Sequence, residues 1–173
     1  MAIVAIDANV LVGLLDERDK WHGTAIAVRD ALDGADAELV YFDCVLNEAV
    51  SVLARRTREQ RRPEQLDALL DQLARLIPVS DITWVSGEIQ RLYGEVVGLV
   101  RSSAGELNFH DALMALICRE QGIAVLVSFD QDERGSKGAG EQGSGGAGDI
   151  TNRLMTVDAM GTASRLVAQS DGG

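Results

Sequence analysis

The chain has 173 residues, of which 46% are hydrophobic and 25% charged, which is typical of one globular domain and excludes a disordered chain. Its 16 basic and 27 acidic residues give a formal charge of −11, which excludes coating of nucleic acid by bulk positive charge but not a local basic groove. No segment approaches the ~20 apolar residues of a membrane span, and the N-terminus lacks the basic region of a signal peptide, so we expect a soluble cytoplasmic protein.

The first half of the chain alternates strand and helix patterns. Residues 2–6 form a short apolar run rich in β-branched residues, which predicts a strand buried on both faces of a parallel sheet. The remaining elements predicted here are helices over residues 8–15 and 24–32, a strand over 38–42, and helices over 45–60 and 63–77.

The second half continues the same alternation. The predicted elements are an extended segment over 79–83, helices over 84–100 and 109–121, strands over 124–129 and 154–157, and a short helix over 159–168. Strands that alternate with helices predict an α/β fold with a mainly parallel sheet.

One segment has no periodicity. Residues 134–149 hold seven glycines in sixteen residues, which predicts a flexible insertion. Because the segment follows a strand, where α/β proteins have their active sites, it could form a mobile lid, but a solvated insertion is the favoured interpretation. We therefore expect a single domain over residues 1–168 that carries this insertion, followed by a disordered tail over 169–173.

Two carboxylates follow predicted buried strands directly. Asp7 ends the first strand, and Asp130 follows the strand that ends near Phe129, with Asp132 close behind. Acids at the carboxyl ends of parallel strands point into the crevice where α/β proteins bind ligands. The alternatives are that Asp7 caps the next helix and that Asp132 is an ordinary loop acid.

Two further acids lie in predicted helices. Glu48 shares a helical stripe with Val45, Ala49 and Val52, where a carboxylate is rare unless it is paired, binds a cation or reaches water at the edge of the stripe. Asp111 begins a helix that is apolar almost all round, and with Asn108 it could instead form a capping box.

Together these acids are expected near one edge of the sheet. Neighbouring carboxylates repel each other, and a divalent cation relieves the repulsion. Oxygen ligands without His or Cys favour Mg²⁺ or Mn²⁺ over zinc.

The two cysteines, Cys44 and Cys118, form no CxxC pair and are expected to be buried free thiols.

Four ordered segments resemble the PIN-domain nucleases, especially the short VapC-type toxins of toxin–antitoxin pairs. They are Ile-Asp-Ala-Asn-Val-Leu-Val at 6–12, Asn-Glu-Ala-Val-Ser-Val-Leu at 47–53, Phe-His-Asp-Ala-Leu-Met-Ala at 109–115 and Leu-Val-Ser-Phe-Asp-Gln-Asp at 126–132. The resemblance spans nearly the whole chain and implies a PIN-like three-layer α/β/α sandwich with a central, mainly parallel sheet.

The resemblance also implies a site and an activity. The implied catalytic and metal-binding acids are Asp7, Glu48, Asp111 and Asp130, with Asp132 as an optional fifth metal ligand and Asn9 and Ser128 as supporting residues. The implied reaction is hydrolysis of RNA phosphodiester bonds with one or two Mg²⁺ or Mn²⁺ ions. The implied partners are an RNA substrate, a cognate antitoxin and a second copy of the chain.

The densest run of basic residues follows the Glu48 segment. It consists of Arg55, Arg56, Arg58, Arg61 and Arg62. It is a candidate for binding RNA phosphates or an acidic antitoxin segment, and the alternative is a solvated helix end whose charges favour the helix dipole.

Two other functions compete with a ribonuclease. The first is a PIN-fold module that binds RNA or a partner without catalysis, although none of the four acids is missing. The second is a haloacid-dehalogenase-type phosphatase, which would use Asp7 as nucleophile but would need an acid at the position of Asn9 and a later lysine.

Overall fold

The protein is built on a six-stranded sheet with the order β3-β2-β1-β4-β5-β6. The computed structural model describes residues 2–129, 154–157 and 163–165, the last two ranges as backbone only. The strands are β1 (Ile3–Ile6), β2 (Glu38–Phe42), β3 (Ile82–Thr83), β4 (Val125–Val127), β5 (Leu154–Val157) and β6 (Ala163–Arg165). The first four strands run parallel to one another, and β5 and β6 continue the sheet antiparallel.

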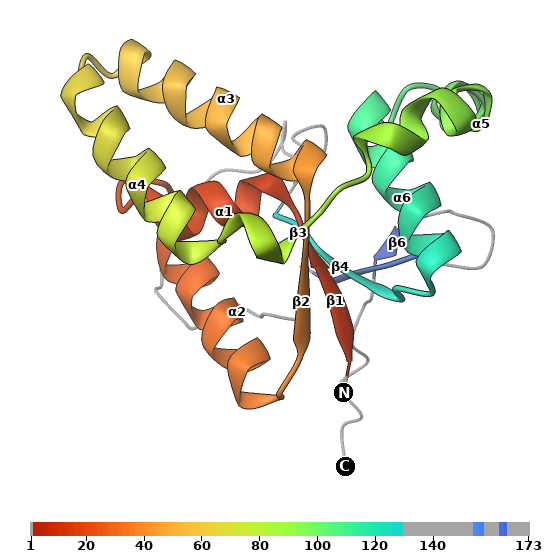
Figure 1. The fold of residues 1–173 in the computed structure, drawn as a ribbon, viewed down its shortest axis with the longest axis horizontal. Coiled ribbons are helices and arrows are strands. Elements are labelled where there is room, and N and C mark those ends of the chain that lie inside the picture. Colours follow the sequence, from red (N-terminus) through yellow and green to blue (C-terminus); the bar gives the residue numbers. More distant parts are fainter. Residues whose placement is uncertain (1, 130–153, 158–162, 166–173) are drawn as a thin grey trace, which may run out of the picture.

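Helices cover both faces of this sheet. They are α1 (Ala8–Leu15), α2 (His22–Gly34), α3 (Asp43–Glu59), α4 (Leu66–Leu76), α5 (Ile89–Ser102) and α6 (Phe109–Gln121), with short 3-10 turns at Pro63–Gln65, Val79–Asp81 and Ser86–Glu88. Figure 1 shows α1 and α2 on one side of the strands and α6 on the other, with α5 beside α6. This arrangement confirms the predicted three-layer α/β/α sandwich.

The core lies between the sheet and the helices that cover its two faces. The side chains of Val4, Ala5 and Ile6 in β1 are at most 2% exposed, which explains the continuous apolar run of this central strand. In α6 every residue from Ala112 to Cys118 is buried, as expected for a helix that is apolar almost all round. Nearly all of α1 is buried as well.

The strand register brings four chain segments to one edge of the sheet. Ala5 lies opposite Val40, Ile6 opposite Val127, and Phe42 opposite Thr83. The residues that follow β1, β2, β3 and β4 therefore line the same carboxyl edge. Figure 1 shows α3 starting on that side of the sheet, immediately after β2.

Several predicted elements agree with the structure, and three require correction. The segment predicted as extended over 79–83 is extended only at Ile82–Thr83, because Val79–Asp81 form a 3-10 turn. The strand at 38–42 and the helices at 8–15 and 109–121 have the predicted bounds. The helix predicted over 84–100 begins only at Ile89. The helix predicted over 159–168 is wrong, because Ala163–Arg165 form strand β6, whose backbone pairs with the edge offered by β5.

The expected insertion at 134–149 and tail at 169–173 lie outside the described residues. Within the described part of the chain, none of the helices combines the length and the apolar character that a membrane crossing requires. Both cysteines are buried and free, as predicted.

Candidate acidic active site

Asp7 is the buried centre of the candidate site. Strand β1 carries it to the carboxyl edge of the sheet, where its backbone N–H donates to the carbonyl of Val127 at 3.0 Å. The residue is only 7% exposed. Its Oδ1 accepts from the backbone N–H of Ala8 at 2.6 Å, so Asp7 does cap α1, which was the alternative to a catalytic role. A cap uses only one of the two carboxylate oxygens.

The second oxygen of Asp7 is held by Asn9 and Ser128. Its Oδ2 accepts from Asn9 Nδ2 at 2.9 Å and from the Ser128 hydroxyl at 2.6 Å. Asn9 also donates to Ser128 Oγ at 2.9 Å and accepts from the Phe129 N–H at 2.9 Å. The structure thus places the two predicted supporting residues against Asp7, and they link the ends of β1 and β4.

Asp111 lies in the first turn of α6 and forms a capping box. Asn108 Oδ1 accepts from the N–H groups of His110 and Asp111 at 2.8 and 3.0 Å. In return, Asp111 Oδ2 accepts from the N–H of Asn108 at 3.1 Å. The capping alternative is therefore realised, and the half-buried carboxylate lies in the first turn of α6.

Glu48 lies in α3 beside the buried residues Val45 and Ala49, which are 1% and 0% exposed. Its own side chain is half-buried, so it sits at the edge of the apolar stripe rather than within it. Asp130 and Asp132 lie outside the described residues.

The described residues alone do not complete a metal site. Among them, no three His, Cys, Asp or Glu side chains come together as metal ligands. The donor chemistry nevertheless fits Mg²⁺ or Mn²⁺, because the site is built around a fixed, buried carboxylate with a hydroxyl and an amide beside it. Both thiols are buried in the core, and burial raises their pKa to about 12, which disfavours thiolate ligation.

Asp43 is a buried acid at the same edge that the sequence analysis missed. It follows β2 as Asp7 follows β1, and that shared position after a strand was the available signal. Asp43 accepts from the backbone N–H groups of Val85 and Ser86 at 2.9 and 3.1 Å and from the Ser86 hydroxyl. Burial alone would raise the pKa of Asp43, but these hydrogen bonds outweigh it and leave the pKa below its ordinary value.

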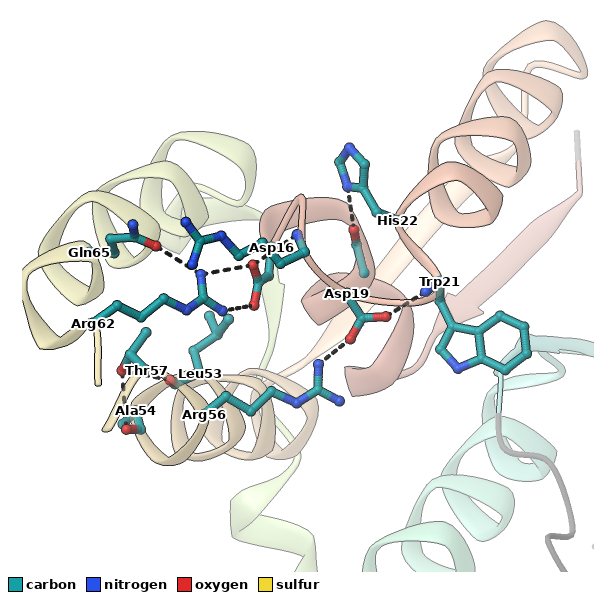
Figure 2. Close-up of polar contacts among 12 residues, drawn as sticks. Asp16, Asp19, Trp21, His22, Leu53, Ala54, Arg56, Thr57, Arg62 and Gln65 are labelled. Atoms are coloured by element: carbon teal, nitrogen blue, oxygen red, sulfur yellow. Dashed lines mark hydrogen bonds and ion pairs between the residues drawn. The ribbon is translucent and has the colours of Figure 1, made fainter. Parts of the chain in front are cut away.

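The arginine run divides into paired and exposed members. Figure 2 shows Arg62 facing Asp16 and Arg56 facing Asp19. Arg62 is 4% exposed and donates from Nη1 and Nη2 to the two oxygens of Asp16 at 3.1 and 2.5 Å. Its guanidinium is therefore committed to the protein interior.

The two ion pairs connect the loop between α1 and α2 to the C-terminal end of α3. Asp16 and Asp19 lie between α1 and α2, whereas Arg56 and Arg62 lie at the end of α3 and just after it. Asp19 also accepts from the Trp21 N–H at 2.7 Å (Figure 2). Burial acts to raise the pKa of Asp16, but the hydrogen bonds from Arg62 and Arg18 outweigh it and lower the pKa.

The exposed arginines are Arg55, Arg58 and Arg61. Arg55 lies 12 residues beyond Asp43 on α3, which at ~1.5 Å per residue is roughly 18 Å from the edge of the sheet. These charges therefore stand well away from Asp7, at the far end of the helix. Arg58 is in the last turn of α3, where a cation also stabilises the helix dipole.

Fold and site together define an α/β/α sandwich with a fixed acid at the end of its first strand. Residues 4–135 match the model of the PIN domain family, and this range is well over half of the chain. The chain therefore belongs to the PIN domain family, which confirms the family resemblance of its four motifs. The match also counts against the phosphatase alternative.

A solved structure supports the same fold. The chain resembles the crystal structure of VapC20 from Mycobacterium tuberculosis, described as a toxin that cleaves the sarcin-ricin loop, with a TM-score of 0.54 and 24% identity. The alignment covers 78% of this chain and 95% of VapC20. A search of curated proteins found no match.

Proposed function

We propose that the protein is a metal-dependent endoribonuclease that hydrolyses RNA phosphodiester bonds and acts as the toxin of a toxin–antitoxin pair. The observation that supports this proposal most strongly is Asp7, a buried carboxylate at the carboxyl edge of the parallel strands. Its Oδ2 is oriented by hydrogen bonds from Asn9 and Ser128. A structural cap needs neither of these two side chains.

The proposed metal ligands are Asp7, Glu48, Asp111 and Asp130, with Asp132 as an optional fifth. A Mg²⁺ or Mn²⁺ ion held by such oxygens activates water and stabilises the charge that develops on phosphate oxygens. Asn9 and Ser128 would keep the Asp7 carboxylate in one orientation, so that little reorganisation accompanies the reaction.

RNA is the proposed substrate because the four motifs resemble those of the PIN-domain nucleases and because the structurally similar VapC20 is described as a toxin that cleaves the sarcin-ricin loop. The net charge of −11 means that the polyanion must be attracted locally. Arg55, Arg58 and Arg61 are exposed and can contact phosphates or an acidic antitoxin segment. Arg62 is buried against Asp16 and Arg56 is paired with Asp19, so the proposed RNA contacts are the three exposed members of the run.

The proposed setting follows from the toxin model. The protein would act in the cytoplasm, bind a cognate antitoxin, and form a homodimer. A small open reading frame that overlaps this gene would support the toxin model over housekeeping RNA processing. Sedimentation of the purified chain would test the dimer directly.

The activity is tested by incubating the purified chain with a mixed RNA pool and Mg²⁺ or Mn²⁺, with EDTA as the metal-free arm. Asp7→Asn preserves the shape of the cap and should abolish cleavage without unfolding the protein. Asp71→Asn, at an exposed position on α4, is the matched control and should cleave as the wild type does. Full activity of Asp7→Asn would contradict the proposed site, and a binding-only module would show no cleavage in any arm.

A further inference from the structure

Trp84 is a large apolar side chain that the fold leaves in solvent. It lies between β3 and the 3-10 turn at Ser86–Glu88, and 68% of its surface is exposed. Among the described residues, neither an aromatic ring nor a cation stacks on it, whereas Trp21, the other tryptophan, packs on Phe129 and lies beneath Lys20. Packing within the described chain therefore does not account for a tryptophan at this position.

The backbone around Trp84 is held firmly. Asp43 accepts from the N–H groups of Val85 and Ser86 and from the Ser86 hydroxyl, and Val85 is only 2% exposed. The exposure of Trp84 is thus a fixed feature rather than the result of a loose loop. A rigid aromatic side chain on a fixed backbone loses little conformational entropy when a ligand stacks on it.

Trp84 shares the sheet edge with Asp7. Extending the register from Ala5–Val40 places Asp7 level with Phe42, and Phe42 lies opposite Thr83. Trp84 is the next residue along. Because β3 is two strands from β1, the two positions are about 10 Å apart along the edge at ~4.8 Å per strand. A few nucleotides of a single strand span that distance.

We propose that Trp84 is the platform on which an unstacked base of the RNA substrate stacks, close to the phosphate that is cleaved. This inference rests on the proposed ribonuclease function. Stacking on an aromatic face needs no positive charge, and every base offers a π-face. Stacking therefore suits this place, where the exposed Asp81 lies three residues before Trp84, Glu88 is paired with Arg91, and the exposed arginines of the run Arg55, Arg58 and Arg61 lie at the far end of α3.

The proposal is tested by binding of a fluorescein-labelled single-stranded RNA of mixed sequence, followed by anisotropy in EDTA. Trp84→Ala is expected to weaken binding by about 5- to 150-fold, the usual range for loss of one base stack. Trp84→Phe keeps an aromatic face and should retain most of the affinity. Val79→Ala removes an apolar side chain that is 73% exposed on the other side of β3, and should bind as the wild type does.

Tryptophan emission gives a second readout. RNA should quench the emission of the wild type, and Trp84→Phe should lose that quenching while still binding the labelled RNA. Unchanged affinity of Trp84→Ala relative to Val79→Ala would overturn the proposal. Trp84 emission that responds to dilution of the protein instead of to RNA would also overturn it, because a second copy would then cover the ring.

The two proposals fail in different ways. If the wild type cleaves RNA and Trp84→Ala cleaves it with an unchanged KM, the ribonuclease function stands and the stacking platform is refuted. If the wild type cleaves no RNA with either metal, the proposed function fails whatever the binding data show.

Discussion

Replacing Arg62 with methionine is expected to lower the free energy of unfolding by about 3–5 kcal/mol, because it leaves a buried carboxylate without its cation. The side chains of Arg62 and Asp16 are 5% and 4% exposed and share two hydrogen bonds. After the change, the Arg18 N–H at 3.1 Å from Asp16 Oδ1 would be the remaining described donor. Methionine keeps the apolar length of the side chain, so the lost charge dominates the effect.

Urea unfolding followed by circular dichroism measures this loss, and thermal melting gives a second estimate. For a chain of this size each kcal/mol corresponds to roughly 2–4 °C, so the melting temperature should fall by about 6–20 °C. Arg91→Met is the matched control, because the Arg91–Glu120 pair is exposed and its loss should change stability little. The double variant Asp16→Leu with Arg62→Met should recover part of the loss, since no unpaired charge stays buried. Equal effects of Arg62→Met and Arg91→Met would show that burial of the Arg62–Asp16 pair contributes nothing beyond an exposed pair.

Three further predictions follow from buried groups and from the glycine-rich segment. Because the pKa of Asp43 is lowered in the folded chain, its stabilising contribution is complete above about pH 4 and is lost as the pH falls through the folded pKa. Asp43→Asn should therefore make the melting temperature depend less steeply on pH on the acid side. An unchanged slope would contradict this prediction. Cys44 and Cys118, with pKa values of about 12, should react with a thiol reagent at pH 8 only after unfolding in urea, and rapid labelling of the native protein would show that the thiols are accessible. Replacing residues 135–148 by a short linker should leave the melting temperature nearly unchanged, and a large drop would show that this segment packs against the domain.

The strong periodic signals predicted the fold well. The apolar β-branched run ending at Ile6 predicted a strand buried on both faces, and the all-round apolar pattern after Asp111 predicted a central helix; both are present. The pairing of Asn108 with Asp111 was also readable, because a capping box depends only on residues three apart.

Errors occurred where distant contacts decide local structure. The start of α5 could not be located from its own residues, because Asp43, more than forty positions earlier, fixes the backbone at Val85 and Ser86. The strand at Ala163–Arg165 is stabilised by pairing with β5, and the local sequence pattern does not predict that pairing.

The site was only partly predictable, because some of its contacts are local in the sequence and others join distant residues. Asp7 follows from its place after a buried strand, and Asn9 and Ser128 were identified only through the family resemblance. The ion pairs of Arg56 and Arg62 were invisible in the sequence, because their partners Asp19 and Asp16 lie about 40 residues earlier in the chain. The sequence suggested that the arginine run over residues 55–62 forms one basic surface, but in the structure Arg62 is buried and Arg55, Arg58 and Arg61 are exposed.

The most direct test of the proposed function is the rate of RNA cleavage as Mn²⁺ is returned to protein treated with EDTA. A metal site built on Asp7 predicts no cleavage without metal, a rate that rises and saturates with Mn²⁺ in the wild type, and no response in Asp7→Asn. A wild-type rate that is the same in EDTA as in Mn²⁺ would contradict a metal site built on Asp7.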